Sequence, residues 1–400
     1  MKNIIILLID ALRPKNLSLF GYNKETDKNI KEIAKNNLLF RQHFSTSNAT
    51  APALTSILTA QYPINHGIIH QLPYTKQEEM DKVEKVTFWF PNYLKNKGYE
   101  TICIDWVGFW LKKDFDFYGE KDENQNELTE KQSLFISAKD TIDLAISRIK
   151  KSKKPFFLFT HFWDTHFPFP NTAYESNGTK EDKDKMLASI QNESQKEYLR
   201  KRIQNTNLYT IQDMVDKYDL AIKDIDYEIG RLYNFLKEQN LWEDTIFFVL
   251  GDHGDNLTSH DIYFSHAGLY DDSIHVPMII HLPGLGKQEI NKFSQHVDII
   301  PTILDYLKFD INTNFDGTSL LPLIKNNITV REKIFAFDGL CNDIKAVRTK
   351  NRKLIIAKDN FCNLCKASHH EPIEEYDLEN DPEETKNIYS KKSELMKFLD

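Results

Sequence analysis

Residues 244–254 read DTIFFVLGDHG, an apolar run that ends in an aspartate and a histidine. The run is too short for a helix, and a continuous apolar stretch of this length is typical of a strand buried on both faces of a parallel sheet. We expect further strands of the same kind, because similar runs occur at residues 3–10, 100–105, 154–162 and 275–284.

Helical patterns separate these runs. Apolar residues recur at helical spacing over 216–237, and residues 86–99 form a second predicted helix that ends at Gly98. Strands that alternate with helices indicate an α/β fold with a doubly wound, mostly parallel central sheet and helices on both faces.

The chain changes character near residue 330, where short strand-like pieces and an acidic tail begin. We therefore predict a main α/β domain over residues 1–329 and a small C-terminal α+β subdomain over 330–400. Two polar stretches, at about 111–132 and 171–215, are expected to be surface insertions, and either could form a lid over a pocket.

The composition limits the class of protein. A chain of 400 residues with 40% hydrophobic and 28% charged residues is globular and can bury a large core. The formal net charge of −8 argues against nucleic-acid binding by a basic surface. A small anionic substrate stays compatible with it, because one pocket lined by cations can oppose the overall sign. The oligomeric state is left open.

The termini and the cysteines add three expectations. The N-terminal sequence MKNIIILLID has no signal-peptide pattern, and no apolar run is long enough for a membrane anchor, so we expect a cytoplasmic protein. Four cysteines do not make a disulfide scaffold. Cys362 and Cys365, with His369 and His370 close behind and Cys341 upstream, could form a zinc clip, but incidental cysteines are the favoured interpretation.

Acidic residues and a histidine follow several of the predicted strands. Asp10, Asp164, Asp252 and His253 stand at or just after the ends of apolar runs. Because ligands of doubly wound sheets bind beyond the carboxyl ends of the strands, we expect these side chains to share one metal or catalytic site.

Residues 44–63, FSTSNATAPALTSILTAQYP, predict a helix that is entered at Thr50. A threonine is a good N-cap, and Pro52 gives up no needed hydrogen bond in the first turn. That structural interpretation is complete by itself, and only the surrounding sequence gives Thr50 a second possible role.

Taken in order, these stretches resemble a sulfatase-type member of the alkaline phosphatase superfamily nearly from end to end. The resemblance is carried by LLIDALRPKNLSLFGY, APALTSILTAQYPINHGI, HFWDTHFPF, the helix that leads to LGDHGDNL, FSHAGLYDDSIHVPMIIHLPG and EEYDLENDPEETKNI. Fold does not by itself give the substrate.

The departures from the sulfatase pattern remove calcium ligands and sulfate-binding cations, and they leave or add imidazole. Sulfatases of this family place a cysteine or serine, converted to formylglycine, in a Cys/Ser-x-Pro-x-Arg motif, whereas this chain has Thr50 in the first position and Leu54 in the last. The second of the paired acids after the first strand is Ala11, and His266 stands in place of a late lysine. The Gly-Lys-x-His motif is also missing, with Asp105 and Val107 in the positions of its lysine and histidine.

The resemblance implies a nucleophile and a metal site. Asp10, Thr50, Asp252 and His253 would hold a divalent cation, and a mixed oxygen and nitrogen set suits Zn or Mn better than Ca. Thr50 would be the nucleophile, since a bound cation lowers the pKa of its hydroxyl.

Other histidines remain secondary. Asp164, His166 and His266 resemble a second metal site or the phosphate contacts of the phosphatase branches, with one metal likewise possible. His260 is a weaker candidate, as a structural histidine fits equally well. His161, His275 and His281 lie within strand-like runs and are expected to be packed or surface residues.

These features predict a metal-dependent hydrolase of phosphate esters, meaning a phosphodiester, phosphonate or phosphomonoester, that works through a covalent intermediate on Thr50. Sulfatase activity is the main alternative, and a phosphoethanolamine-type transferase is a further one. A non-catalytic binding module on the same fold is the alternative outside enzymology.

Overall fold

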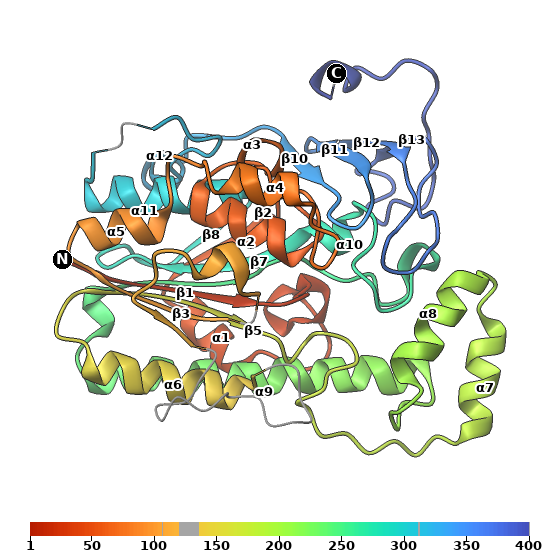
Figure 1. Ribbon diagram of the computed structural model, residues 1–400, viewed down its shortest axis with the longest axis horizontal. Coiled ribbons are helices and arrows are strands. Elements are labelled where there is room, and N and C mark those ends of the chain that lie inside the picture. Colours follow the sequence, from red (N-terminus) through yellow and green to blue (C-terminus); the bar gives the residue numbers. More distant parts are fainter. Residues whose placement is uncertain (106, 120–135, 311–312, 400) are drawn as a thin grey trace.

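The computed structural model describes residues 1–105, 107–119, 136–310 and 313–399. A central sheet with helices on both faces makes up most of the molecule, and a second, smaller sheet lies at one end of it (Figure 1). The expected α/β architecture with a C-terminal subdomain is confirmed.

The central sheet has nine strands in the order β4-β3-β5-β1-β6-β7-β2-β8, with β9 paired to β2. Its pairs are parallel except for β6 with β7 and β7 with β2. The strands are β1 Asn3–Ile9, β2 Leu38–Phe44, β3 Glu100–Ile104, β4 Phe117–Tyr118, β5 Phe156–Phe162, β6 Thr245–Gly251, β7 His275–His281, β8 Gln288–Ile290 and β9 Ser294–Gln295.

Alternate residues of β1 explain the two helical layers. Ile5, Leu7 and Ile9 belong to one buried cluster, which is covered by α1, α6 and α9, whereas Ile4 and Ile6 belong to the other, under α2, α5 and α11. Successive side chains of a strand point to opposite faces, so a wholly apolar strand needs cover on both. The helices are α1 Lys28–Ala34, α2 Thr50–Thr59, α3 Pro63–His66, α4 Gln77–Val83, α5 Phe90–Asn96, α6 Ala138–Lys151, α7 Lys180–Ser189, α8 Glu193–Ile203, α9 Ile211–Glu238, α10 Asp271–Ile274, α11 Ile299–Leu307 and α12 Leu321–Asn326.

Two elements differ from the sequence-based expectation. The strand β2, which pairs antiparallel with β7 and parallel with β8, was not predicted, because Arg41 and Gln42 interrupt its apolar pattern. The helix expected over 86–99 begins only at Phe90, with Pro91 in its first turn, where the missing N–H of proline costs nothing.

The C-terminal subdomain is an antiparallel sheet in the order β10-β11-β12-β13. Its strands are β10 Ile334–Phe337, β11 Asp343–Arg348, β12 Arg352–Asp359 and β13 Ile373–Asp377. The polar stretch 171–215 contains α7 and α8, whereas most of the stretch 111–132 lies outside the described residues. Within the described ranges, no helix is both long enough and apolar enough to cross a bilayer.

A buried histidine in this fold predicts acid sensitivity. Ile68 N–H donates to His66 Nδ1 at 3.1 Å, and Nε2 lies 3.0 Å from Ser56 Oγ. Burial lowers the pKa of His66 from 6.5 to about 3. The unfolded chain therefore binds a proton that the folded chain does not, and the free energy of unfolding falls as the pH drops below 6.5.

We expect His66→Gln to reduce this dependence by about 1.4 kcal/mol per pH unit over the acidic range. Urea unfolding at a series of pH values measures the slope. An unchanged slope in the variant would contradict the assignment.

Candidate active site

Three elements deliver the central side chains of the site. Asp10 follows β1, Asp252 and His253 follow β6, and Thr50 is the first residue of α2. The backbone N–H of Asp10 donates to Phe162 O at 3.0 Å, and that of Asp252 donates to Ile9 O at 3.2 Å. Because these bonds continue the sheet past its strands, both carboxylates are held at its carboxyl edge, as expected.

The four side chains predicted to form the metal site meet there. Thr50 Oγ1 lies 3.3 Å from Asp10 Oδ1 and 3.2 Å from His253 Nε2. His253 Nε2 is 3.7 Å from Asp10 Oδ1 and 3.5 Å from Asp252 Oδ2. All four residues are at least 98% buried. Asp10, Thr50, Asp252 and His253, which the sequence predicted to form one site, therefore lie together in the structure.

The same atoms fit a divalent cation. Asp10 Oδ2 and Asp252 Oδ2 are buried without a hydrogen-bond partner among the described residues. Burial raises the pKa of Asp10 well above its usual value, and the neighbouring Asp252 raises it further. Two carboxylates this close to each other cannot both stay ionised away from water unless positive charge lies between them. A cation bound by both would satisfy the two oxygens.

His161 joins this group, although the sequence assigned it to packing. Its imidazole lies in a compact buried group with Asp10 and Asp252, and Nε2 is 3.4 Å from Asp252 Oδ2. Nδ1 lies 3.1 Å from Asp105 Oδ1. Burial lowers the pKa of His161, but the neighbouring carboxylates of Asp105 and Asp252 outweigh it and raise the pKa to about 10. With its proton, His161 orients Asp252, and it could serve as a metal ligand only if the bound cation displaced that proton.

Expectation and structure agree for the other two strand histidines. His275 Nε2 lies 2.8 Å from Arg41 O, and the ring of His281 stacks on Trp242. In the sequence, the one sign that His161 belongs to the site is its position inside an otherwise apolar run, just before the Asp-x-His segment. Its partner Asp105 directly follows β3, so the rule on acids at strand ends applies to it as well, but no local pattern shows its contact with His161.

We expect His161→Gln to weaken the binding of Mn²⁺ or Zn²⁺ by about 10- to 100-fold, as is usual when a group that orients a metal ligand is lost. Competition with a chromogenic chelator measures the affinity. His281→Gln is the matched control, because it alters a histidine of β7 that stacks on Trp242 and takes no part in the predicted metal site. Equal affinity in wild type and His161→Gln would show that His161 only packs.

The start of α2 is not capped as the sequence suggests. Ala49 occupies the N-cap position, and Thr50 is the first helical residue, with its hydroxyl facing Asp10 and His253. The next backbone N–H, that of Ala51, donates to Gln71 Oε1 at 2.8 Å. Gln71 was not singled out from the sequence, and it brings an amide group to the edge of the site.

His266 and His166 lie beside the central group. The His266 ring stacks on His253 with centroids 4.4 Å apart, and its Nδ1 hydrogen-bonds to Asn48 O. A carbonyl only accepts, so Nδ1 carries the proton, and Nε2 of the neutral ring presents a lone pair. Burial lowers the pKa of His266 to about 3. Burial, together with Arg202, His266 and His253, lowers that of His166 to about 3 as well.

Asp164 and His260 make their contacts elsewhere. Asp164 Oδ1 accepts from the backbone N–H of Ala138 at 3.1 Å, at the start of α6. An acid in this position stabilises a helix N-terminus, so the described contacts of Asp164 are structural. His260 stacks on Tyr270 with ring centroids 3.6 Å apart, which fits the structural alternative.

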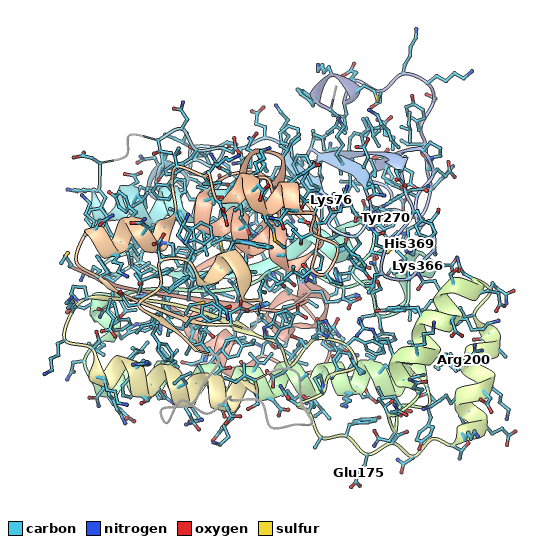
Figure 2. The ribbon with its side chains drawn as sticks, viewed as in Figure 1. Lys76, Glu175, Arg200, Tyr270, Lys366 and His369 are labelled. Atoms are coloured by element: carbon cyan, nitrogen blue, oxygen red, sulfur yellow. The ribbon has the colours of Figure 1, made fainter. Side chains whose placement is uncertain are left out.

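A cavity of about 490 Å³ lies between α8 and the C-terminal subdomain. Tyr198, Arg202, Cys365 and Lys366 are among its lining residues, and Figure 2 shows Lys366 on the loop that faces α8. Arg202 also contributes to the low pKa of His166. The stretch 171–215 thus contributes a cation, Arg202, to the lining of this cavity.

Comparisons with known proteins agree with this arrangement. The sulfatase family profile matches residues 2–309, and the profile for the C-terminal part of N-sulphoglucosamine sulphohydrolase matches residues 259–398. An arylsulfatase of Clostridium perfringens is 25% identical over 81% of this chain and 66% of its own length. The chain thus spans slightly less than two thirds of that relative.

Two further proteins resemble it over more of their length. The multifunctional alkaline phosphatase superfamily protein PehA of Trinickia caryophylli is 24% identical over 97% of this chain and 91% of its own. The structure of a phosphonate monoester hydrolase of Agrobacterium radiobacter superposes with a TM-score of 0.68 at 17% identity, over 97% of this chain and 91% of that one. At that identity the superposition shows a shared fold.

Proposed function

The chain belongs to the sulfatase family of the alkaline phosphatase superfamily, and from that membership we propose that it hydrolyses phosphate esters through a covalent intermediate on Thr50. Membership makes it a hydrolase of sulfuric or phosphoric esters. The choice of phosphate, whether diester, phosphonate or monoester, and the covalent role of Thr50 are the proposal.

One observation carries it. The hydroxyl of Thr50 lies within 3.3 Å of both an aspartate and a histidine of the predicted metal site. The threonine β-methyl group rules out the formylglycine aldehyde on which the resembled sulfatases rely, so the residue in this position keeps its hydroxyl. A buried hydroxyl at a carboxylate and imidazole cluster is a suitable nucleophile for a tetrahedral ester.

The chain's own groups account for both halves of the reaction. Thr50 Oγ1 forms a bond to phosphorus while the bond from phosphorus to the leaving oxygen breaks, and the hydroxyl proton passes to the solvent or to the leaving oxygen. Water then attacks phosphorus, the bond to Thr50 breaks, and a proton of that water returns to Oγ1. We assign the contact with the ester to His166, whose pKa burial lowers to about 3, so that its ring is neutral.

Asp10, Thr50, Asp252 and His253 would hold the cation, with His161 beside them. Bound there, a divalent ion would lower the pKa of the Thr50 hydroxyl and counter the charge of the ester oxygens. The imidazole in the set favours Zn or Mn over Ca. Because Nε2 of His266 carries a lone pair, His266 is better suited to bind a second cation than to donate a hydrogen bond from that atom.

Parallel assays with nitrophenyl phosphodiester, phosphomonoester, phosphonate and sulfate, in the presence of Zn²⁺, Mn²⁺ or Ca²⁺, test the proposal. We expect at least one phosphorus ester to have a higher kcat/KM than the sulfate, with Zn²⁺ or Mn²⁺ the more effective ion. Turnover of the sulfate alone would identify a sulfatase instead.

The same assay separates the remaining alternatives. Release of nitrophenol that depends on an added alcohol acceptor, with the phosphoryl group recovered on that acceptor, would indicate a transferase. No turnover of any ester with any ion would indicate a non-catalytic module.

A further inference from the structure

We propose that Cys341, Cys362, Cys365 and His369 bind a structural zinc ion that joins two loops of the C-terminal subdomain next to the entry to α2. The four residues take no part in the chemistry proposed for Thr50. The sequence pattern alone favoured incidental cysteines, whereas the contacts in the structure favour a zinc site.

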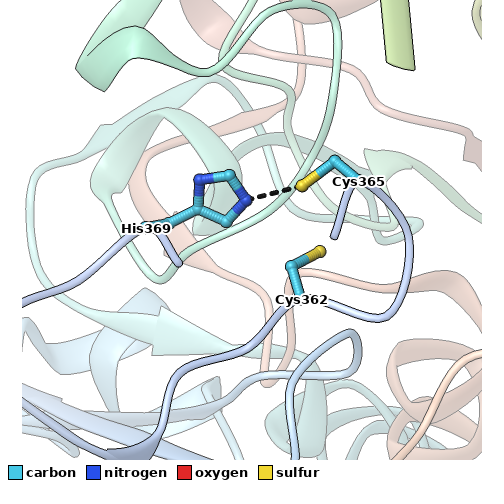
Figure 3. A group of neighbouring side chains, drawn as sticks. All are labelled: Cys362, Cys365 and His369. Atoms are coloured by element: carbon cyan, nitrogen blue, oxygen red, sulfur yellow. Dashed lines mark hydrogen bonds between the residues drawn. The ribbon is translucent and has the colours of Figure 1, made fainter. Parts of the chain in front are cut away.

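The ligand atoms of the CxxC segment already converge. Cys362, Cys365 and His369 each direct one ligand atom into a common group, with all three atoms within 4.8 Å of one another (Figure 3). Cys365 Sγ lies 2.8 Å from His369 Nε2. Cys362 and Cys365 are buried, and His369 is half-buried.

Cys341 supplies the fourth ligand from a different part of the chain. Its thiol interacts with that of Cys362, and Cys341 itself is fully buried. It lies in the turn between β10 and β11, whereas the other three residues lie in the loop between β12 and β13. Three of the chain's four cysteines thus meet in one place although 21 residues separate Cys341 from Cys362.

Zinc is the metal that this set fits. Three thiolates and one imidazole form a common closed, tetrahedral zinc site. In such a site the ligand atoms lie about 3.5–4 Å apart, so Cys362, Cys365 and His369 need only small rotations from their positions here. Ions such as Ca²⁺ and Mg²⁺ prefer oxygen ligands, and the set has none.

The position of the cluster gives the ion a structural effect. The backbone N–H groups of Leu340 and Cys341 donate to Asp338 Oδ1, and Asp338 Oδ2 accepts from Asn48 Nδ2 at 3.0 Å. Asn48 Oδ1 in turn accepts from Gly339 N–H at 2.8 Å. Asn48 is two residues before Thr50, so the turn that carries Cys341 braces the entry to α2.

The other side of the cluster faces the cavity. Cys365 and Lys366 line it opposite α8, and Figure 2 shows Lys366 and His369 close together on this side of the molecule. A zinc ion would therefore fix the loop by which Lys366 lines this cavity.

Metal analysis of the full-length Asp10→Asn variant, after dialysis that strips weakly bound ions, tests the proposal separately from the active site, because that substitution weakens the other metal site. We expect about one zinc per chain to remain. Replacing the metal with Co²⁺ should give the intense near-ultraviolet absorption of a thiolate-to-cobalt bond, which Asp10, Thr50, Asp252 and His253 cannot produce.

Cys362→Ser should lose both the zinc and the thiolate band, whereas Cys103→Ala, which alters the one cysteine outside the cluster, should keep them. If Asp10→Asn holds no zinc and its Co²⁺ form lacks the thiolate band, the proposal is wrong. That result includes the case in which mass spectrometry finds a Cys362–Cys365 disulfide. Failure of phosphate-ester hydrolysis would leave this outcome unaffected.

Discussion

Thr50→Ala is expected to hydrolyse its ester at least about ten-thousandfold more slowly than wild type, because removal of a catalytic nucleophile costs that much or more. The methyl group of alanine leaves α2 intact but removes the hydroxyl that lies between Asp10 and His253. Steady-state kcat/KM with the best phosphorus ester of the nitrophenyl series measures the effect, and metal content is determined alongside it.

Two variants serve as controls for Thr50→Ala. Thr50→Ser keeps a hydroxyl at the same place and should retain measurable turnover. Thr59→Ala removes a buried hydroxyl from the far end of the same helix and should leave kcat/KM within a few-fold of wild type. If Thr50→Ala hydrolyses the ester at the wild-type rate, Thr50 is not the nucleophile.

The second large effect is expected for Asp10→Asn. The substitution keeps the shape of the side chain but removes the negative charge of a predicted metal ligand. Loss of about 4 kcal/mol of transition-state stabilisation, or on the order of a thousandfold in kcat/KM, should follow. Metal titration monitored by activity should also show that more Zn²⁺ or Mn²⁺ is needed for half-maximal turnover.

Asp164→Asn is the matched control for this change. Its amide oxygen can still accept from Ala138 N–H at the start of α6, so activity and metal requirement should stay close to wild type. If Asp164→Asn lowers kcat/KM as much as Asp10→Asn does, Asp164 belongs to the site, as the sequence predicts.

The fold and the centre of the site could be predicted because their signals are local. Each buried strand is a continuous apolar run, and the parallel strands β1 and β6 bring the residues that follow them to one edge. Knowing the strand ends therefore placed Asp10 and Asp252 together, and the resemblance added Thr50.

The rest depends on contacts that no local pattern contains. His161 owes its place to Asp105 and Asp252, each from a different strand end. Gln71 reaches Ala51 from a loop. Asp164 Oδ1 accepts from the N–H of Ala138 at a helix N-terminus, and its place in the site stays a prediction.

The stereochemical course at phosphorus tests the central claim most directly. Hydrolysis of a single-enantiomer phosphorothioate diester in ¹⁸O-labelled water reports how many displacements occur. Attack by Thr50 followed by attack by water inverts phosphorus twice, so we predict net retention of configuration. Net inversion would show a single attack by water and contradict a covalent role for Thr50, as would hydrolysis of an aryl sulfate by a protein that leaves the phosphorothioate untouched.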